Sequence, residues 1–199
     1  MAVVRILGID PGTRVVGFGC LEITIGVPAR PSQTSPLAMR GSNVVSAAAS
    51  SGSDLRFVEA GVLRLGGRDA ELDRRLLSLA EQFRALVDRL RPTQVALEEA
   101  FAGKSAQAAL RIGEARGVVI AESARTGLPV RQFAPARVKR CVTGNGAASK
   151  ETVAAMVDQL VLGGRGSVAR GLPADASDAV AVALAWVEMQ RSPLQMLGG

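Results

Sequence analysis

Four acidic residues stand at the ends of predicted secondary-structure elements. Asp10 follows an apolar run and precedes a Pro-Gly turn, and Glu98 ends the short apolar stretch QVALE. Asp175 and Asp178 lie three residues apart at the start of the last predicted helix, so they share one helix face. Carboxylates that meet in one place repel each other unless a divalent cation neutralises them. Two such cations can activate a water and stabilise a leaving oxyanion, so the pattern favours phosphoryl chemistry.

The absence of histidine and of closely spaced cysteines limits the possible catalytic chemistry further. The 199-residue chain has no histidine, which excludes a Ser-His-Asp triad, a Cys-His pair and a His-ligated zinc site. Cys20 and Cys141 lie far apart in the sequence and cannot form a thiolate metal site, so we expect free thiols in a reducing compartment. The oxygen ligands that remain select Mg²⁺ or Mn²⁺, or else Ca²⁺.

The charge balance indicates the class of partner. A net charge of +6 and a pI of about 10.5 favour a polyanion, nucleic acid before membrane, although a surface rich in arginine would give the same values. The first apolar run is broken by Arg5 and Asp10, so it does not predict a secretory signal. No stretch of about 18 apolar residues predicts a transmembrane helix. We therefore expect a cytoplasmic protein.

The elements that must position the acids follow an α/β pattern. Short apolar runs predict strands over 3–10, 15–25, 55–65, 94–98 and 128–133. Apolar residues at steps of three or four predict helices over 69–90, 105–125, 134–142, 150–162 and 175–189. This order predicts a mixed five-stranded sheet flanked by helices, an antiparallel meander followed by parallel crossover strands. We expect one domain over residues 1–192 and a frayed tail over 193–199.

Two further segments have no settled role from the residues alone. Residues 26–53 are rich in Pro, Ser, Ala and Gly without periodicity, which predicts a flexible insertion. It could be inert or could meet DNA or a partner, and we favour an inert insertion because it holds only two arginines. The predicted helix over 105–125 carries one stripe of small residues. Such a stripe suits tight packing on the chain's own sheet and a dimer contact equally well. Its members are Ala106, Ala109, Gly113, Gly117 and Ala121.

Simpler interpretations compete with the acidic site. Asp10 could cap its turn, Glu99 competes with Glu98, and the two late aspartates could serve only the start of their helix. The segment GNGAASK looks like a phosphate-binding loop, but it lacks a Gly directly before Lys150, so we predict a turn with Ser149 as the helix cap. Lys139 and Lys150 are candidate phosphate contacts or ordinary surface charges.

Four blocks in this order resemble the RuvC family of Holliday junction resolvases. They are ILGIDPGTRVVGFG, VALEEAFAGKSAQAALRIGEARGVVIA, PVRQFAPARVKRCVTGNGAASK and LPADASDAVAVALA. The resemblance implies a ribonuclease H-like fold and a homodimer that cleaves two strands of a four-way DNA junction symmetrically, in recombination and repair. It implies two Mg²⁺ ions in each active site, or Mn²⁺ in their place, and the partners RuvA and RuvB. It also favours the dimer contact for the small-residue helix.

The resemblance also assigns roles to single residues. Asp175 matches the third member of the family's usual acidic trio, and Asp178 matches a fourth position. Phe101 matches an aromatic position that stacks on a base at the junction. The complete implied set is Asp10, Glu98, Asp175 and Asp178 for metal and catalysis, and Phe101, Lys139 and Lys150 for DNA. Arg137 and Arg140, which stand in the same predicted helix as Lys139, are further candidates for DNA binding. The alternatives to this endonuclease are a sugar kinase or Hsp70-like ATPase and a module that binds junctions without cutting them.

Overall fold

The computed structural model describes residues 2–25, 55–67, 69–100, 106–161 and 172–191. Their elements follow the predicted order. The predicted insertion 26–53, the tail 193–199 and Phe101 lie outside the described residues. The elements are β1 (Ala2–Pro11), β2 (Val15–Ile25), β3 (Leu55–Arg64), α1 (Leu72–Leu90), β4 (Gln94–Glu98), α2 (Ala106–Arg125), β5 (Val130–Phe133), α3 (Pro135–Thr143), α4 (Lys150–Val161) and α5 (Ala174–Arg191).

Several bounds differ from the predicted ones, and local hydrogen bonds that compete with the regular element explain two of these differences. Before α1, the Ala70 N–H donates to the Gly67 carbonyl oxygen at 3.2 Å, so this stretch is a turn and not the first turn of the helix. After α2, the Leu128 N–H donates back to the Ser123 carbonyl oxygen at 2.9 Å. Residue 128 therefore closes the helix, and β5 starts two residues later than predicted.

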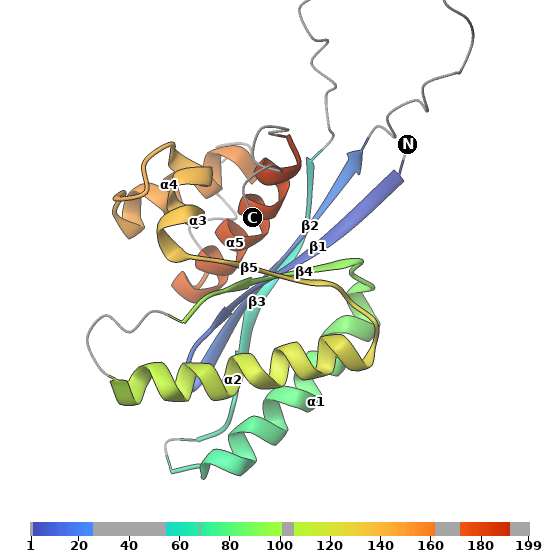
Figure 1. The fold of residues 1–199 in the computed structure, drawn as a ribbon, viewed down its shortest axis with the longest axis vertical. Coiled ribbons are helices and arrows are strands. Elements are labelled where there is room, and N and C mark those ends of the chain that lie inside the picture. The colour runs from blue at the N-terminus through green and yellow to red at the C-terminus, as the bar shows by residue number, and fades with distance from the viewer. Residues whose placement is uncertain (1, 26–54, 68, 101–105, 162–171, 192–199) are drawn as a thin grey trace, which may run out of the picture.

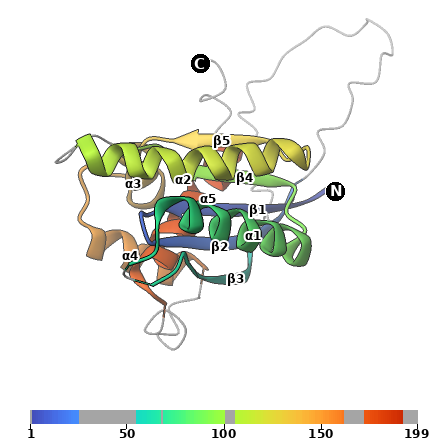
Figure 2. The same ribbon diagram turned by 90° about the horizontal axis from the view of Figure 1, so that it is seen from below.

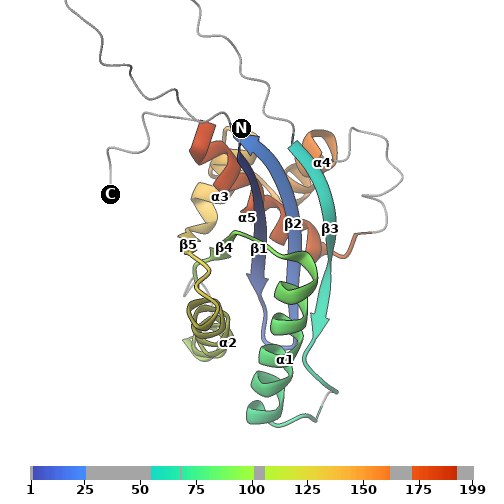
Figure 3. The same cartoon turned by 90° about the vertical axis from the view of Figure 1, so that its right-hand side faces the viewer.

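The five strands form one mixed sheet in the order β3-β2-β1-β4-β5. β1, β2 and β3 pair antiparallel, whereas β1 with β4 and β4 with β5 pair parallel. This arrangement confirms the predicted meander followed by crossover strands (Figure 3). β1 lies in the centre, with β2 on one side and β4 on the other, so the carboxyl ends of β1 and β4 lie next to each other.

Helices cover both faces of the sheet, α1 and α2 on one and α3, α4 and α5 on the other (Figures 1 and 2). Alternate residues of a strand point to opposite faces. Leu7 and Ile9 accordingly belong to the core under α1 and α2, and Ile6 and Ala96 belong to the core around α5. The same alternation directs residues 10 and 98 towards α5. No described helix is long and apolar enough to cross a bilayer.

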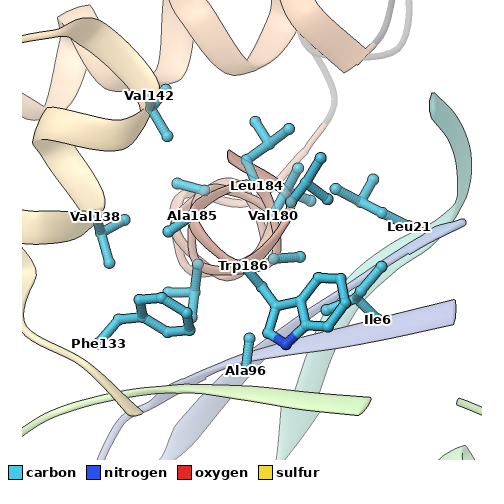
Figure 4. Packing of buried hydrophobic residues seen from close by; sticks show 14 of the residues in the cluster. Ile6, Leu21, Ala96, Phe133, Val138, Val142, Val180, Leu184, Ala185 and Trp186 are labelled. Atoms are coloured by element: carbon cyan, nitrogen blue, oxygen red, sulfur yellow. The ribbon is translucent and has the colours of Figure 1, made fainter. Parts of the chain in front are cut away.

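Helix α5 is apolar on all sides and is enclosed by the rest of the fold. Eleven of its residues, from Ala176 to Met189, are buried. Figure 4 shows its side chains radiating into a core built by the sheet on one side and α3 on the other. The labelled residues of this core are Ile6, Leu21, Ala96, Phe133, Val138, Val142, Val180, Leu184, Ala185 and Trp186. A helix that is apolar all round is stable only in such an enclosed position.

Three glycines let α5 approach the strands backbone to backbone. A Cβ atom on Gly8 would lie 2.1 Å from the Ala179 carbonyl oxygen, and one on Gly17 would lie 1.9 Å from the Asp175 carbonyl oxygen. A Cβ atom on Gly19 would lie 2.5 Å from the Val180 side chain and 2.8 Å from its backbone. We call Gly8, Gly17 and Gly19 the glycine track. Any larger residue on it must push α5 away from the sheet.

We expect Gly8→Ala to lower the free energy of unfolding by about 2 kcal/mol or more, because overpacking in a closed core costs this much. Chemical denaturation followed by circular dichroism measures the change. Gly67→Ala is the matched control, since a Cβ atom at that position meets nothing within 4 Å. Equal stabilities of the two variants would show that α5 can move away from β1 at little cost.

Candidate active site

A pocket of about 280 Å³ lies at the carboxyl ends of β1 and β4, where three of the four predicted acids meet. Asp10 comes from β1, Glu98 from β4 and Asp178 from α5. The lining residues are Asp10, Glu98, Pro135, Val138, Lys139, Lys150, Val153, Asp178 and Ala181. Strand alternation accounts for the first two acids, because both lie near the carboxyl ends of their strands and face α5.

Asp10 and Glu98 form a hydrogen-bonded pair of carboxyl groups. The pKa of Asp10 is raised from 3.8 to about 8, chiefly by burial and then by the charge and hydrogen bond of Glu98 and the charge of Asp178, against a lowering by Lys150. Burial also raises the pKa of Glu98, which the hydrogen bond from Asp10 partly offsets. The pair therefore holds one proton at neutral pH. That proton relieves the repulsion between two buried carboxylates.

Asp178 is paired with a lysine. The Lys150 Nζ donates to Asp178 Oδ2 at 2.8 Å, and this hydrogen bond raises the pKa of Lys150. The Lys150 side chain is 74% exposed and the Asp178 side chain 23%. An ion pair that is so open to solvent is worth little free energy. Lys150 can therefore leave Asp178 at small cost.

The two lysines of the pocket flank the loop between α3 and α4, with Lys139 on α3 and Lys150 at the start of α4. The Lys139 Nζ donates to the Ala148 carbonyl oxygen at 2.7 Å, which joins α3 to this loop. The Ser149 Oγ accepts from the Thr152 N–H at 3.2 Å, so Ser149 caps α4 as predicted. The segment GNGAASK is thus a turn and a helix cap, and it presents Lys150 in the first turn of α4.

The fourth predicted acid lies elsewhere. Asp175 is exposed in the first turn of α5, outside the pocket, with its carbonyl oxygen directed at Gly17. Glu99 is exposed too, and only its neighbour Glu98 lines the pocket. The structure therefore brings Asp10, Glu98 and Asp178 together and leaves Asp175 one helical turn away.

Arg137 and Arg140 lie on α3 with exposed side chains and do not line the pocket. The Arg137 guanidinium lies 6.0 Å from the centre of the Phe133 ring. Their predicted role in binding DNA remains a prediction, as does that of Phe101. Sequence reasoning missed Arg116, whose guanidinium donates to the Glu98 carbonyl oxygen. The sequence of the helix that contains Arg116 shows a pattern of small residues and gives no signal of this contact.

The chemistry of the donors suits a hard divalent cation. All three acids supply oxygen ligands, which Mg²⁺ and Mn²⁺ prefer. The proton between Asp10 and Glu98 and the ammonium group on Asp178 supply the positive charge that a cation would supply. Among the residues that the structure describes, no three Asp, Glu, Cys or His side chains are grouped so that they could hold a metal ion as they stand. A metal site here requires Asp178 to exchange Lys150 for the cation.

Comparisons with known proteins identify the family to which this chain is similar. A family model described as "Crossover junction endodeoxyribonuclease RuvC" matches residues 36–186. The crossover junction endodeoxyribonuclease RuvC of Halorhodospira halophila is 36% identical over 191 residues, which cover 96% of this chain and 93% of that protein. The solved structure of Thermus thermophilus RuvC is similar with a TM-score of 0.70 at 26% identity, over 94% of this chain and 96% of that chain. A structure of T. thermophilus RuvC in complex with a Holliday junction substrate has a TM-score of 0.71 at 24% identity, over 94% and 95%.

The raised pKa of Asp10 predicts how the stability of the metal-free protein depends on pH. The folded state keeps the Asp10 proton up to about pH 8, whereas an unfolded aspartate loses it near its ordinary value of 3.8. Between these pH values the folded state binds more protons, so stability falls as pH rises. We expect Asp10→Asn to remove this slope and to be more stable than wild type at pH 8 by at least about 1 kcal/mol, or roughly 2–4 °C.

Thermal unfolding in EDTA at pH 5 and pH 8 measures this difference. Glu99→Gln is the control, because it neutralises an exposed carboxylate next to the pair. Parallel pH profiles for wild type and Asp10→Asn would contradict the protonated pair.

Proposed function

This chain belongs to the RuvC family of crossover junction endodeoxyribonucleases, and we propose that the pocket around Asp10, Glu98 and Asp178 is where it cleaves DNA. It is a Holliday junction resolvase with a ribonuclease H-like fold, a DNA-binding nuclease of recombination and repair. One observation carries the assignment of the site. Two carboxyl groups meet at the ends of adjacent parallel strands, in a pocket that also presents two lysines.

RuvC enzymes are metal-dependent nucleases. We propose that Asp10, Glu98 and Asp178 hold Mg²⁺, or Mn²⁺ in its place, with Asp175 completing a site for two ions. When bound, such ions supply a Lewis acid for the phosphate and an activated water. The protonated Asp10–Glu98 pair supports this proposal, because buried carboxyl groups that crowd together gain most from a cation. Asp10 must lose its proton before both of its oxygens can act as ligands.

The lysines are suited to hold the phosphate that is cut. Lys139 uses one of its three donors on the Ala148 carbonyl oxygen, which fixes its direction and leaves two donors for a ligand. Lys150 would be released from Asp178 if that carboxylate bound a cation. Both ammonium groups can then meet phosphate oxygens at the mouth of the pocket. The chain thus positions the phosphate with lysines and the cation with carboxylates, and needs no histidine.

We propose that the chain acts as a homodimer through α2. The small-residue stripe does not pack on the chain's own sheet, because Ala106, Gly113, Gly117 and Ala121 are exposed in the structure. Leu110 on the same helix is 69% exposed. A second copy would cover this apolar surface, and two active sites would then face the two strands of one junction. The partners RuvA and RuvB and a cytoplasmic location are further proposals that follow from this substrate.

The assignment of the pocket predicts a sharp difference between two neighbouring glutamates. We expect Glu98→Gln to lower Mg²⁺-dependent cleavage of a labelled four-way junction by about 10³-fold or more, because it removes a pocket carboxylate. Glu99→Gln should cut at nearly the wild-type rate, since Glu99 is exposed. Junction binding measured in EDTA should remain in both variants. Equal cleavage rates for the two variants would place the active site elsewhere.

The same assay distinguishes the two aspartates of α5. We expect Asp178→Asn to abolish cleavage, because Asp178 lines the pocket. Asp175→Asn should also slow cleavage if Asp175 completes the site for two ions. A wild-type rate for Asp175→Asn would reduce the proposed set to three carboxylates.

The dimer proposal predicts that a charge in the stripe separates the subunits. Gly117→Glu should shift the protein from dimer to monomer in analytical ultracentrifugation while the helix content stays unchanged, since Glu favours helix more than Gly does. A Cβ atom at Gly117 meets nothing within 4 Å inside the chain. Gly67→Glu, at a position equally open but outside α2, is the control. A dimer that survives Gly117→Glu would place the contact on another surface.

A further inference from the structure

Arg116 joins α2 to the strand that carries Glu98. One guanidinium nitrogen, Nη1, donates to the Glu98 backbone carbonyl oxygen, and the other, Nη2, donates to Oε1 of Gln132 on β5. α2 runs beside β4 and β5 on the face of the sheet opposite α5 (Figure 2). Arg116 therefore reaches the end of β4 from the side away from the pocket, and contacts the backbone of Glu98 rather than its carboxylate.

The register of the sheet explains why this carbonyl is available. The Glu99 N–H donates to Phe133 in β5 at 2.9 Å, so the backbone groups of residue 98 face β1. β1 and β4 pair Ile9 with Leu97. In that register the N–H that would donate to the Glu98 carbonyl belongs to residue 11. Residue 11 is Pro11, which has no N–H.

The two contacts hold one peptide unit from both ends. The peptide between Glu98 and Glu99 has its N–H bound to the Phe133 carbonyl oxygen and its carbonyl bound to Arg116. Fixing this peptide plane fixes the backbone torsion of Glu98 and hence the direction of its side chain. β4 ends at Glu98, so no later strand residue of β4 stabilises this geometry.

We infer that Arg116 is a positioning residue for Glu98. Its guanidinium group replaces the N–H donor that Pro11 lacks in the pairing of β1 with β4, and it ties the end of β4 to Gln132 of β5. The inference rests on the proposed function, in which Glu98 holds the cation. Residues behind metal ligands typically change metal affinity or activity by about 10–100-fold when they are replaced. A small error in the direction of a reacting group costs a similar factor.

The test compares two arginines of the same helix. Arg116→Gln removes the fork, and Arg111→Gln removes an equal charge whose partner is Glu114. Three quantities are measured: the single-turnover cleavage rate at saturating enzyme, the junction affinity in EDTA, and the Mn²⁺ concentration that half-saturates thermal stabilisation without DNA. We expect Arg116→Gln to cut at least about ten-fold more slowly and to need at least about ten-fold more Mn²⁺. Both variants should bind the junction with affinities within about two-fold of each other.

Other outcomes overturn the inference. A wild-type rate and Mn²⁺ requirement for Arg116→Gln, or a weaker junction affinity as its only defect, would make Arg116 an ordinary DNA-binding or surface residue. If Arg116→Gln does not fold, Arg116→Lys decides, because it keeps the charge but lacks the planar two-nitrogen fork that binds the two acceptors. A slower rate and a higher Mn²⁺ requirement in that folded variant support the role, and wild-type values refute it. If wild type itself does not cleave junctions, the proposed function fails, whereas the Mn²⁺ titration still tests Arg116.

Discussion

Helix α5 lies directly on the backbones of β1 and β2, and the pocket depends on that contact. The glycine track leaves no side chain between helix and sheet, so the separation of the two backbones is as small as their atoms allow. Hydrogen-bonded backbone is stiff, and close-packed interiors transmit strain rather than absorb it. The distance between Asp178 on α5 and Asp10 on β1 is therefore set by the two backbones. A Cβ atom on the track would widen the pocket and weaken the core at the same time.

This contact forces acidic groups together, and the pocket balances their charge in two ways. Burial and neighbouring charge raise the pKa of Asp10 to about 8, so it shares a proton with Glu98. Lys150 neutralises Asp178 from the solvent side. Both forms of charge neutralisation are reversible, because the proton of the Asp10–Glu98 pair can pass to water and the exposed ammonium group of Lys150 can rotate away. Under the proposed function, cation binding is then coupled to proton release, and it frees Lys150 for the phosphate.

The order of elements and the meeting of Asp10 with Glu98 could be predicted, because both follow from local rules. Apolar runs mark the strands, and the period of two directs both carboxylates to one face. The same local rules could not decide which of Asp175 and Asp178 enters the pocket. Residues three apart on a helix share a face, and only the rotation of α5, set by its contact with Gly17, decides which one enters the pocket. The periodicity of α2 shows which residues are small but not whether a neighbour covers them.

The three pocket acids come from distant parts of the chain, and each is positioned through its backbone. Asp10 is held by strand pairing on β1, Asp178 by the contact of α5 with the glycine track, and Glu98 by the peptide that follows it. Positioning by backbone leaves the carboxyl groups of Asp10 and Glu98 to each other and that of Asp178 to an exposed lysine. The ammonium group that binds Asp178 belongs to Lys150, whose side chain is 74% exposed. Under the proposed function, the fold uses its stable hydrogen bonds on the main chain and leaves the carboxylates to an exchangeable cation.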